Sequence, residues 1–463
     1  MTEQLKLKLN DSKATRWGAL VIVAFTMMAA YYVNDVVAPL KTMLETDLAW
    51  SSTDFGFFTG GYSFLNVFFL MLIWGGLILD RFGIRFTGKL ATILMVGGTA
   101  LEYYAMTGLA GADATLFGIN EIFGYKTGVF VAFAGYSIFG VGAEVAGITV
   151  SKIIAKWFKG KELATAMGVQ VAVARIGSQA GYAVAIPLAR AFGISTPVLL
   201  GLVLLLGGMI AFFIFAVMDK KLDKQMEAAA IAAGTEDEEE KFSFKDVKNI
   251  LVNPGFWLIA LLCVLFYSCV FPFQKFASEL MIIKYGINEN VAGTFAGLPA
   301  LGALILTPVF GGFIDKRGKS ASIMLLGSAM LICVHFIYAI PDINYWLVAI
   351  VLMIILGIAF SLVPSAMWPA VAKIFPVSQL GTAYALIFFI QNIGLWGIPT
   401  LIGWVLDAYC ISGKKPDGTN MYDYTVPMCI FTSIACLSLI VALLLKKADK
   451  KYGYKLEEPN IQK

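Results

Sequence analysis

The chain has 463 residues, of which 59% are hydrophobic and only 14% are charged, and its mean hydropathy is +0.78. Such a composition excludes an ordinary soluble globular protein, because a soluble chain of this length would separate its cores with polar surface. The net charge of +4 does not indicate a nucleic-acid partner, since the basic residues lie in polar connections on one side of the apolar runs.

Apolar runs long enough to cross a bilayer as helices recur along the whole chain. Six are predicted in the first half, at 17–40, 55–79, 87–108, 127–150, 163–189 and 195–218. Six more are predicted in the second half, at 254–282, 290–313, 321–341, 344–371, 379–406 and 424–446. We therefore predict an all-α membrane protein with twelve transmembrane helices in two six-helix bundles, 17–218 and 254–446, and with tails at 1–16 and 447–463.

The polar segment 219–253 separates the two bundles. It is basic at both ends and acidic at Glu236–Glu240, which is typical of a solvated linker. Most of the 35 Lys and Arg residues lie in the tails, this linker and the other even-numbered connections, so the positive-inside rule places both termini in the cytoplasm. Arg175 and Lys275 are the basic residues that lie inside predicted spans.

The two halves share a sequence pattern. The connection after the second span has a glycine, three residues and Asp80-Arg81, and the connection after the eighth span has a glycine, three residues and Asp315-Lys316. Further along, Ile176-Gly177 matches Ile393-Gly394. Two parallel six-helix repeats predict a binding cavity between them, near the middle of the bilayer.

With these paired loops the chain resembles the major facilitator superfamily. The resemblance implies that Asp80 and Asp315, with Arg81 and Lys316 beside them, act as cytoplasmic gating residues. In that family the aspartate engages basic residues and the start of the eleventh or fifth helix in the outward-open state.

A closer resemblance is to the major facilitator superfamily domain-containing protein one branch, which includes a lysosomal dipeptide uniporter. The stretches that carry it are 140–144, 157–163, 174–178, 366–369, 379–384 and 391–394. The resemblance implies that Glu144 and Arg175 contact the charged backbone of a dipeptide. It also implies an accessory subunit, of which the sequence itself shows no sign.

Glu144 and Arg175 lie equally far from the short turn at Lys159-Gly160, between the spans 127–150 and 163–189. At about 1.5 Å per residue both should lie roughly 20 Å from that turn, facing each other near the middle of the membrane. Each charge costs on the order of 3 kcal/mol there. They either form a structural ion pair or bind the two ends of a zwitterion, with Glu144 receiving an ammonium and Arg175 a carboxylate.

Other polar side chains of the spans could complete such a site. The candidates are Tyr62, Asn66, Trp368, Tyr384, Gln391 and Asn392. Lys275 is predicted nearer the outer surface, where it either snorkels, pairs with Glu279 one turn away, or forms an outer gate with Asp35.

We expect a transporter and not an enzyme, with no cofactor and no metal site. The favoured substrate is a dipeptide. We expect uniport, because 31–37 lacks the Glu-x-x-Glu-Arg pattern of proton-coupled peptide transporters. An organic-anion or monocarboxylate carrier, a proton-coupled carrier and a nutrient sensor without net flux are the alternatives. The predicted outer connections contain no Asn-x-Ser/Thr acceptor, which favours a bacterial inner membrane over a lysosomal one.

Overall fold

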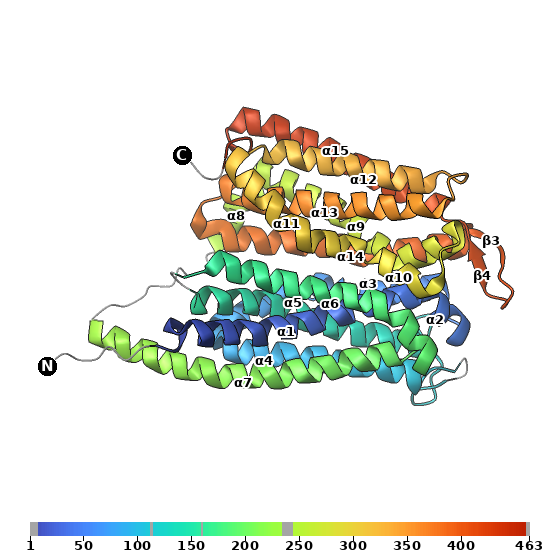
Figure 1. Cartoon of the computed structure of the whole chain (residues 1–463), viewed down its shortest axis with the longest axis horizontal. Coiled ribbons are helices and arrows are strands. Elements are labelled where there is room, and N and C mark those ends of the chain that lie inside the picture. Colours follow the sequence, from blue (N-terminus) through green and yellow to red (C-terminus); the bar gives the residue numbers. More distant parts are fainter. Residues whose placement is uncertain (1–7, 112–113, 159–160, 234–243, 460–463) are drawn as a thin grey trace.

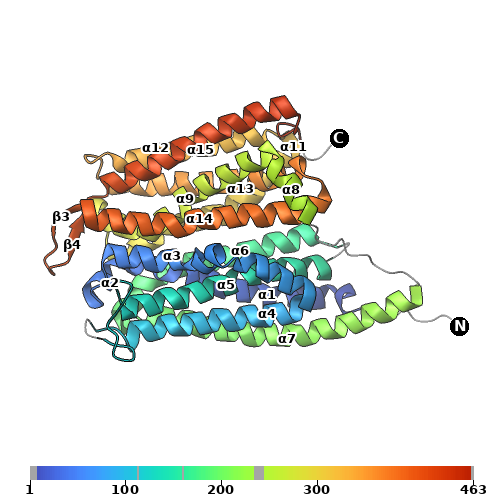
Figure 2. The same cartoon turned by 180° about the vertical axis from the view of Figure 1, so that it is seen from behind.

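The computed structural model describes residues 8–111, 114–158, 161–233 and 244–459, which form two bundles of helices that lie side by side (Figure 1, Figure 2). The first bundle contains η1 (Leu9–Asp11), α1 (Lys13–Val36), η2 (Ala38–Leu40), α2 (Lys41–Asp47), α3 (Ser52–Phe68), α4 (Met71–Thr107), the short strands β1 (Glu121–Ile122) and β2 (Tyr125–Lys126), α5 (Thr127–Trp157), α6 (Leu163–Phe192) and α7 (Thr196–Ala233). The second contains α8 (Phe244–Val252), α9 (Pro254–Tyr285), α10 (Glu289–Ala296), α11 (Leu298–Arg317), α12 (Ser320–Ala339), α13 (Trp346–Ile374), α14 (Val377–Tyr409), β3 (Ile411–Lys414), β4 (Asn420–Tyr422) and α15 (Thr425–Tyr452).

The two ends of the molecule differ. The first and last described residues lie at one end, called here the terminus end, and the antiparallel β3–β4 hairpin projects from the opposite end, called here the hairpin end (Figure 1). By the expected topology the terminus end is cytoplasmic.

The predicted all-α transmembrane architecture is confirmed. Ten described helices are long and apolar enough to cross a membrane, and α3 and α4 form a further pair bent by 58°. Within α4 the helix is interrupted at Gly83, whose φ of 74° and ψ of 174° are not helical. The part of α4 before Gly83 therefore completes the predicted span 55–79, and the part after it supplies the span 87–108, which gives twelve spans.

The bend between α3 and α4 was not predicted. Leu70, which precedes α4, has a φ of 53°, a left-handed conformation that is unfavourable for a bulky residue because its Cβ crowds the backbone. The second span is therefore a broken helix rather than the continuous helix that its apolar sequence indicates.

The expected linker 219–253 is helical over most of its described part. Helix α7 continues through its first residues to Ala233, and α8 occupies 244–252. Asp219 is buried, and the cost of burying its carboxylate is offset by hydrogen bonds from Lys156 (2.8 Å) and from the indole nitrogen of Trp157 (2.9 Å). The acidic run Glu236–Glu240 and the turn at Lys159-Gly160 lie outside the described residues.

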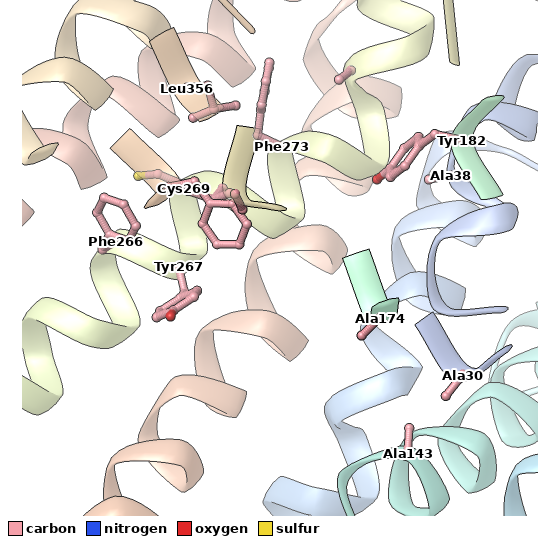
Figure 3. Close-up of a cluster of buried hydrophobic side chains, with 14 of the residues drawn as sticks. Ala30, Ala38, Ala143, Ala174, Tyr182, Phe266, Tyr267, Cys269, Phe273 and Leu356 are labelled. Atoms are coloured by element: carbon pink, nitrogen blue, oxygen red, sulfur yellow. The ribbon is translucent and has the colours of Figure 1, made fainter. Parts of the chain in front are cut away.

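Buried side chains of unequal size fill the two bundles. Figure 3 shows the large rings of Phe266 and Phe273 on α9, and the small side chains of Ala30, Ala143 and Ala174 on α1, α5 and α6. Small residues let neighbouring helices approach closely, which is the usual way helices associate in a membrane.

Close backbone contact between α3 and α14 joins the two bundles toward the hairpin end. A Cβ atom added at Gly403 of α14 would lie 2.2 Å from the backbone oxygen of Ser52, and one added at Gly56 of α3 would lie 2.4 Å from that of Pro399. Backbone atoms cannot move aside as a flexible side chain can, so these two glycines are required for the bundles to meet here.

We expect Gly403→Val to force the bundles apart at the hairpin end, at a cost of about 1–3 kcal/mol to the packed arrangement. The buried residue Thr59 on α3 then becomes accessible. The measurement is labelling of Thr59→Cys by a water-soluble maleimide, with the exposed Cys333 and Cys429 replaced by serine. Gly397→Val on the same helix is the control, because a Cβ there meets nothing within 4 Å; equal labelling of both variants would contradict the prediction.

Candidate functional site

A cavity of about 240 Å³ lies between the two bundles. Its walls come from α1, α3, α5 and α6 of the first bundle and from α9, α13 and α14 of the second. The predicted binding residues that line it are Glu144, Arg175, Tyr62, Trp368, Gln391 and Asn392, and the predicted gating residue Lys275 lines it as well.

Glu144 reaches the cavity from α5, where glycines let neighbouring helices approach. A Cβ at Gly140, one turn before it, would lie 2.0 Å from the backbone oxygen of Tyr62, so α5 and α3 are in direct backbone contact. This contact brings the Tyr62 hydroxyl within 3.0 Å of Glu144 Oε1, to which it donates a hydrogen bond. Glu144 is thereby oriented by a neutral donor, and its charge is left without a cationic partner among the described residues.

Arg175 reaches the cavity from α6 and is flanked by aromatic rings. Its guanidinium carbon lies 5.4 Å from the centre of the Tyr31 ring on α1 and 4.9 Å from that of Phe360 on α13. Cation–π contacts stabilise a guanidinium without using its N–H donors. Within the described part of the chain Arg175 has neither a hydrogen bond nor an ion pair, so its planar fork is free for a ligand.

Of the two alternatives for Glu144 and Arg175, the structural ion pair is the one that the structure does not show. They line the same cavity, but each has its own neighbours and no ion pair joins them. The reason is that α1 packs against α6: a Cβ at Gly177 would lie 2.1 Å from the backbone oxygen of Met28. This contact places the Tyr31 ring over Arg175, which the spacing along α5 and α6 could not predict.

The second bundle contributes an aromatic and amide wall. The ring of Trp368 stacks on Phe388 at 4.8 Å between centres, and its indole nitrogen donates to the Tyr267 hydroxyl at 3.3 Å. Asn392 donates to the backbone oxygen of Phe388 at 2.9 Å, and its buried side-chain oxygen has no partner among the described residues. That oxygen is available to accept a hydrogen bond from a ligand.

Two predicted binding residues do not line the cavity. Tyr384 lies behind Trp368 and donates to its backbone oxygen at 3.0 Å. Asn66 is buried and donates to the backbone oxygen of Tyr62 at 3.4 Å. Asn66 follows Tyr62 by one turn of α3, and Tyr384 precedes Phe388 by one turn of α14, so both share a helix face with cavity residues but lie one turn beyond the cavity, where they support its wall.

The predicted partners Lys275 and Asp35 are in contact across the two bundles. Lys275 Nζ lies 3.2 Å from Asp35 Oδ1 and 2.5 Å from the backbone oxygen of Asn34, and its other neighbour is the Tyr136 hydroxyl at 3.4 Å. The second oxygen of Asp35 accepts a 2.6 Å hydrogen bond from Ser178. Tyr136, Asn34 and Ser178 were not among the predicted residues, since single polar residues in apolar spans are common and carry no distinctive pattern.

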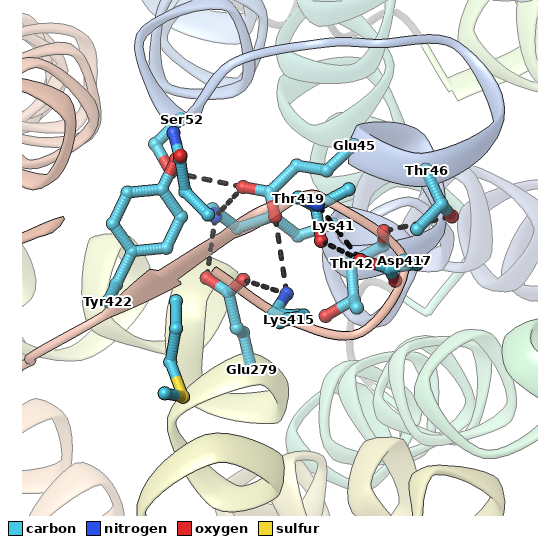
Figure 4. Close-up of polar contacts among 12 residues, drawn as sticks. Lys41, Thr42, Glu45, Thr46, Ser52, Glu279, Lys415, Asp417, Thr419 and Tyr422 are labelled. Atoms are coloured by element: carbon cyan, nitrogen blue, oxygen red, sulfur yellow. Dashed lines mark hydrogen bonds and ion pairs between the residues drawn. The ribbon is translucent and has the colours of Figure 1, made fainter. Parts of the chain in front are cut away.

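Glu279 belongs to a different group of charges, which the sequence did not reveal. At the hairpin end, Lys41 Nζ lies 2.5 Å from both Glu45 Oε1 and Glu279 Oε2, and all three side chains are buried (Figure 4). Lys415, carried by the turn of the β3–β4 hairpin, lies 3.5 Å from Glu45 and 3.7 Å from Glu279. These four residues, called here the outer charge cluster, join the two bundles with balanced charge.

The gating residues predicted at the terminus end lie in the expected connections. Asp80 is paired with Lys152 of α5 at 3.0 Å, within its own bundle, and the Arg81 guanidinium lies 5.5 Å from the centre of the Phe82 ring. Asp315 and Lys316 are in the last turn of α11. The Asp80–Lys152 pair is exposed, and exposed pairs contribute about 0–1 kcal/mol.

Comparison with known proteins identifies the class of protein that this fold and cavity define. The sequence profile of the Major Facilitator Superfamily matches residues 20–399 and 276–456, so the chain belongs to that superfamily of membrane transporters. The fold is shared with the nucleoside transporter NupG (TM-score 0.68, 12% identity, covering 92% of this chain and 98% of NupG). It is shared also with a D-xylose-proton symporter (TM-score 0.64, 15% identity, 93% and 97% covered).

Among curated proteins the chain is similar to lysosomal dipeptide transporters. It is 28% identical to the human lysosomal dipeptide transporter MFSD1 in an alignment of 450 residues that covers 94% of this chain and 87% of that protein. The corresponding transporter of Danio rerio is 26% identical in an alignment of 441 residues that covers 93% of this chain and 86% of that protein. The chain is therefore a membrane transporter that resembles this branch of the superfamily, which is not a family of enzymes.

Proposed function

We propose that this chain transports dipeptides by alternating access and without coupling to an ion. The observation that carries the proposal is the separation of Glu144 and Arg175 in one cavity, each without an oppositely charged partner among the described residues. A site with one available carboxylate and one available guanidinium complements a zwitterion, whose ammonium and carboxylate would occupy them.

The energetics favour a binding role over a structural one. A charged side chain in the middle of a membrane costs on the order of 3 kcal/mol, and a structural ion pair would reduce this cost permanently. Here the two charges are stabilised instead by a tyrosine hydroxyl and by aromatic rings. Such contacts leave carboxylate and guanidinium atoms free for charge-assisted hydrogen bonds with a ligand, which are about twice as strong as neutral ones.

The size and walls of the cavity suit a small peptide. Its volume of about 240 Å³ is below the range usual for sites of drug-sized ligands, which favours a small solute. The polar groups Gln391 and Asn392 face it from α14, where they could bind a peptide amide, and the rings of Trp368 and Phe388 offer apolar surface to side chains. The similarity to transporters named for dipeptides supports the same substrate class.

Thermal unfolding of the purified protein with candidate solutes tests the substrate. We expect zwitterionic dipeptides to raise the melting temperature, because a ligand at one hundred times its Kd stabilises the folded state by about 2.7 kcal/mol. N-acetylated dipeptides lack the ammonium, and simple carboxylates lack both the ammonium and the amide, so both should stabilise it far less. Equal stabilisation by these two control classes would replace the proposal with an organic-anion carrier.

Transport itself is tested with the same dipeptides in proteoliposomes. Uniport predicts counterflow of labelled dipeptide that is unaffected by a protonophore. Dipeptide accumulation that requires a proton gradient would contradict uniport while leaving the substrate assignment intact.

A further inference from the structure

A groove of about 510 Å³ lies between α4 and α7 at the terminus end, apart from the central cavity. In both views these helices lie at the edge of the first bundle that is farthest from the second bundle (Figure 1, Figure 2). This edge faces the lipid in the expected transmembrane arrangement. Arg85, Lys89, Lys220, Phe82, Phe86 and Val217 line the groove.

The groove carries uncompensated positive charge. Lys89 and Lys220 are exposed, and neither has an acidic partner among the described residues. Arg85 does have partners, since it lies 2.8 Å from Asp223 and 3.8 Å from Asp219. Those two carboxylates also bind Lys156, so the acidic charge beside the groove is already matched by Arg85 and Lys156.

Exposed apolar side chains continue from the cations toward the middle of the bundle. Phe82, Phe86 and Val217 are each at least half exposed. Beyond them along the same two helices are the exposed side chains of Ile93, Ile210 and Ile214. The groove therefore has a cationic end that continues into an apolar strip. The cationic end lies where the apolar sequence of α7 gives way to Asp219 and Lys220.

The packing of α4 against α7 fixes the floor of this groove. A Cβ atom at Gly88 would lie 1.9 Å from the ring of Phe212, so only glycine at this position lets the ring pack directly on the backbone of α4. Lys89 follows Gly88 immediately, and its Nζ lies 5.6 Å from the centre of the Phe213 ring. The close approach of the α4 and α7 backbones beneath the groove is thus determined by this contact.

We propose that this groove binds an anionic phospholipid, with its phosphate between Lys89 and Lys220 and an acyl chain along the apolar strip of α4 and α7. Basic pockets between transmembrane helices at a membrane surface suit anionic headgroups. A free phosphate would use the cations but not the strip, and a zwitterionic lipid would use the strip but gain little from the uncompensated charge.

The test is a lipid titration of the full-length protein in detergent, followed by native mass spectrometry. We expect phosphatidylglycerol to bind more tightly than phosphatidylcholine of the same acyl chains. The double variant Lys89→Gln/Lys220→Gln should bind phosphatidylglycerol about 25-fold more weakly, at about fivefold for each cation near a membrane surface. Both side chains are exposed and have no acidic partner among the described residues, so the variant should fold normally, which its melting temperature checks.

The matched control is Lys450→Gln/Lys451→Gln, which removes two exposed lysines of α15 at the same end of the molecule. It should keep wild-type affinity for phosphatidylglycerol. An equal loss in both double variants would show diffuse attraction and overturn the site, as would equal affinity for the two lipids. Displacement of the lipid by millimolar inorganic phosphate would also overturn it, in favour of a phosphate site. None of these results depends on what the protein transports.

Discussion

Replacing Arg175 by alanine is expected to abolish dipeptide uptake while leaving the protein folded. In the proposed site Arg175 binds the substrate carboxylate, and removal of one partner of a buried, hydrogen-bonded charge pair costs about 2–5 kcal/mol. This corresponds to a loss of affinity between about 30-fold and several thousand-fold. Folding should be preserved, because the contacts that Arg175 makes are cation–π contacts with Tyr31 and Phe360, worth about 0.5–2 kcal/mol.

Two further variants separate charge from geometry. Arg175→Lys keeps the charge but not the planar fork, so it should remain strongly impaired. Glu144→Gln should also abolish uptake of dipeptides, and in thermal unfolding it should bind dipeptides no better than their N-acetylated forms. Counterflow in proteoliposomes measures each activity, and Ile176→Ala is the control, since Ile176 is the exposed neighbour of Arg175 on α6 and does not line the cavity.

The amount of folded protein decides between the two interpretations of these charges. If Arg175→Ala or Glu144→Gln reduced abundance and melting temperature instead of uptake, the residues would have a structural role. Normal folding with normal uptake would contradict the proposed site altogether.

Glu279→Gln is expected to destabilise the arrangement in which the hairpin end is closed. The outer charge cluster contains two lysines and two glutamates, so loss of the Glu279 charge leaves one buried positive charge in excess. Breaking a buried ion pair in this way costs about 3–5 kcal/mol. Because Glu279 joins Lys41 across the bundles, part of this cost should appear as opening at the hairpin end, with labelling of Thr59→Cys increased by up to about a hundredfold.

A double variant and a surface control make the cluster prediction specific. Lys41→Met/Glu279→Gln leaves Glu45 and Lys415 as a balanced pair, so it should be less destabilised than the sum of the single variants. Glu289→Gln removes an exposed partner of Arg190 at the same end and should change labelling little, since exposed pairs contribute at most about 1 kcal/mol. Additive effects of Lys41→Met and Glu279→Gln would show that the cluster does not act as a unit.

Much of the architecture could be predicted from local patterns. Apolar runs of membrane length predicted the helices, and the matching loops at Asp80 and Asp315 predicted two related halves. Glu144 and Arg175 were found because a charge in an apolar span is conspicuous, and because depth along a helix is proportional to residue number. Lys275 was noticed for the same reason, and its contact with Asp35 was one of the alternatives considered.

Other features depend on which helices meet, and this is not encoded at any one position. The break at Leu70 occurs within a run that is apolar throughout, so nothing in its pattern marks it. The outer charge cluster draws Lys41, Glu279 and Lys415 from three distant segments, two of which are ordinary polar connections in the sequence.

The sequence by itself determined the class of protein, its helices and the two charges that define the candidate site. Only the tertiary structure decided that these charges are not paired with each other. The physical reason is the close approach of α1 to α6 at Gly177 and of α3 to α5 at Gly140, where backbone contacts bring Tyr31 over Arg175 and Tyr62 to Glu144. Spacing along one helix gives depth in the membrane, whereas the partner of a side chain depends on the rotation and neighbours of the helix that carries it.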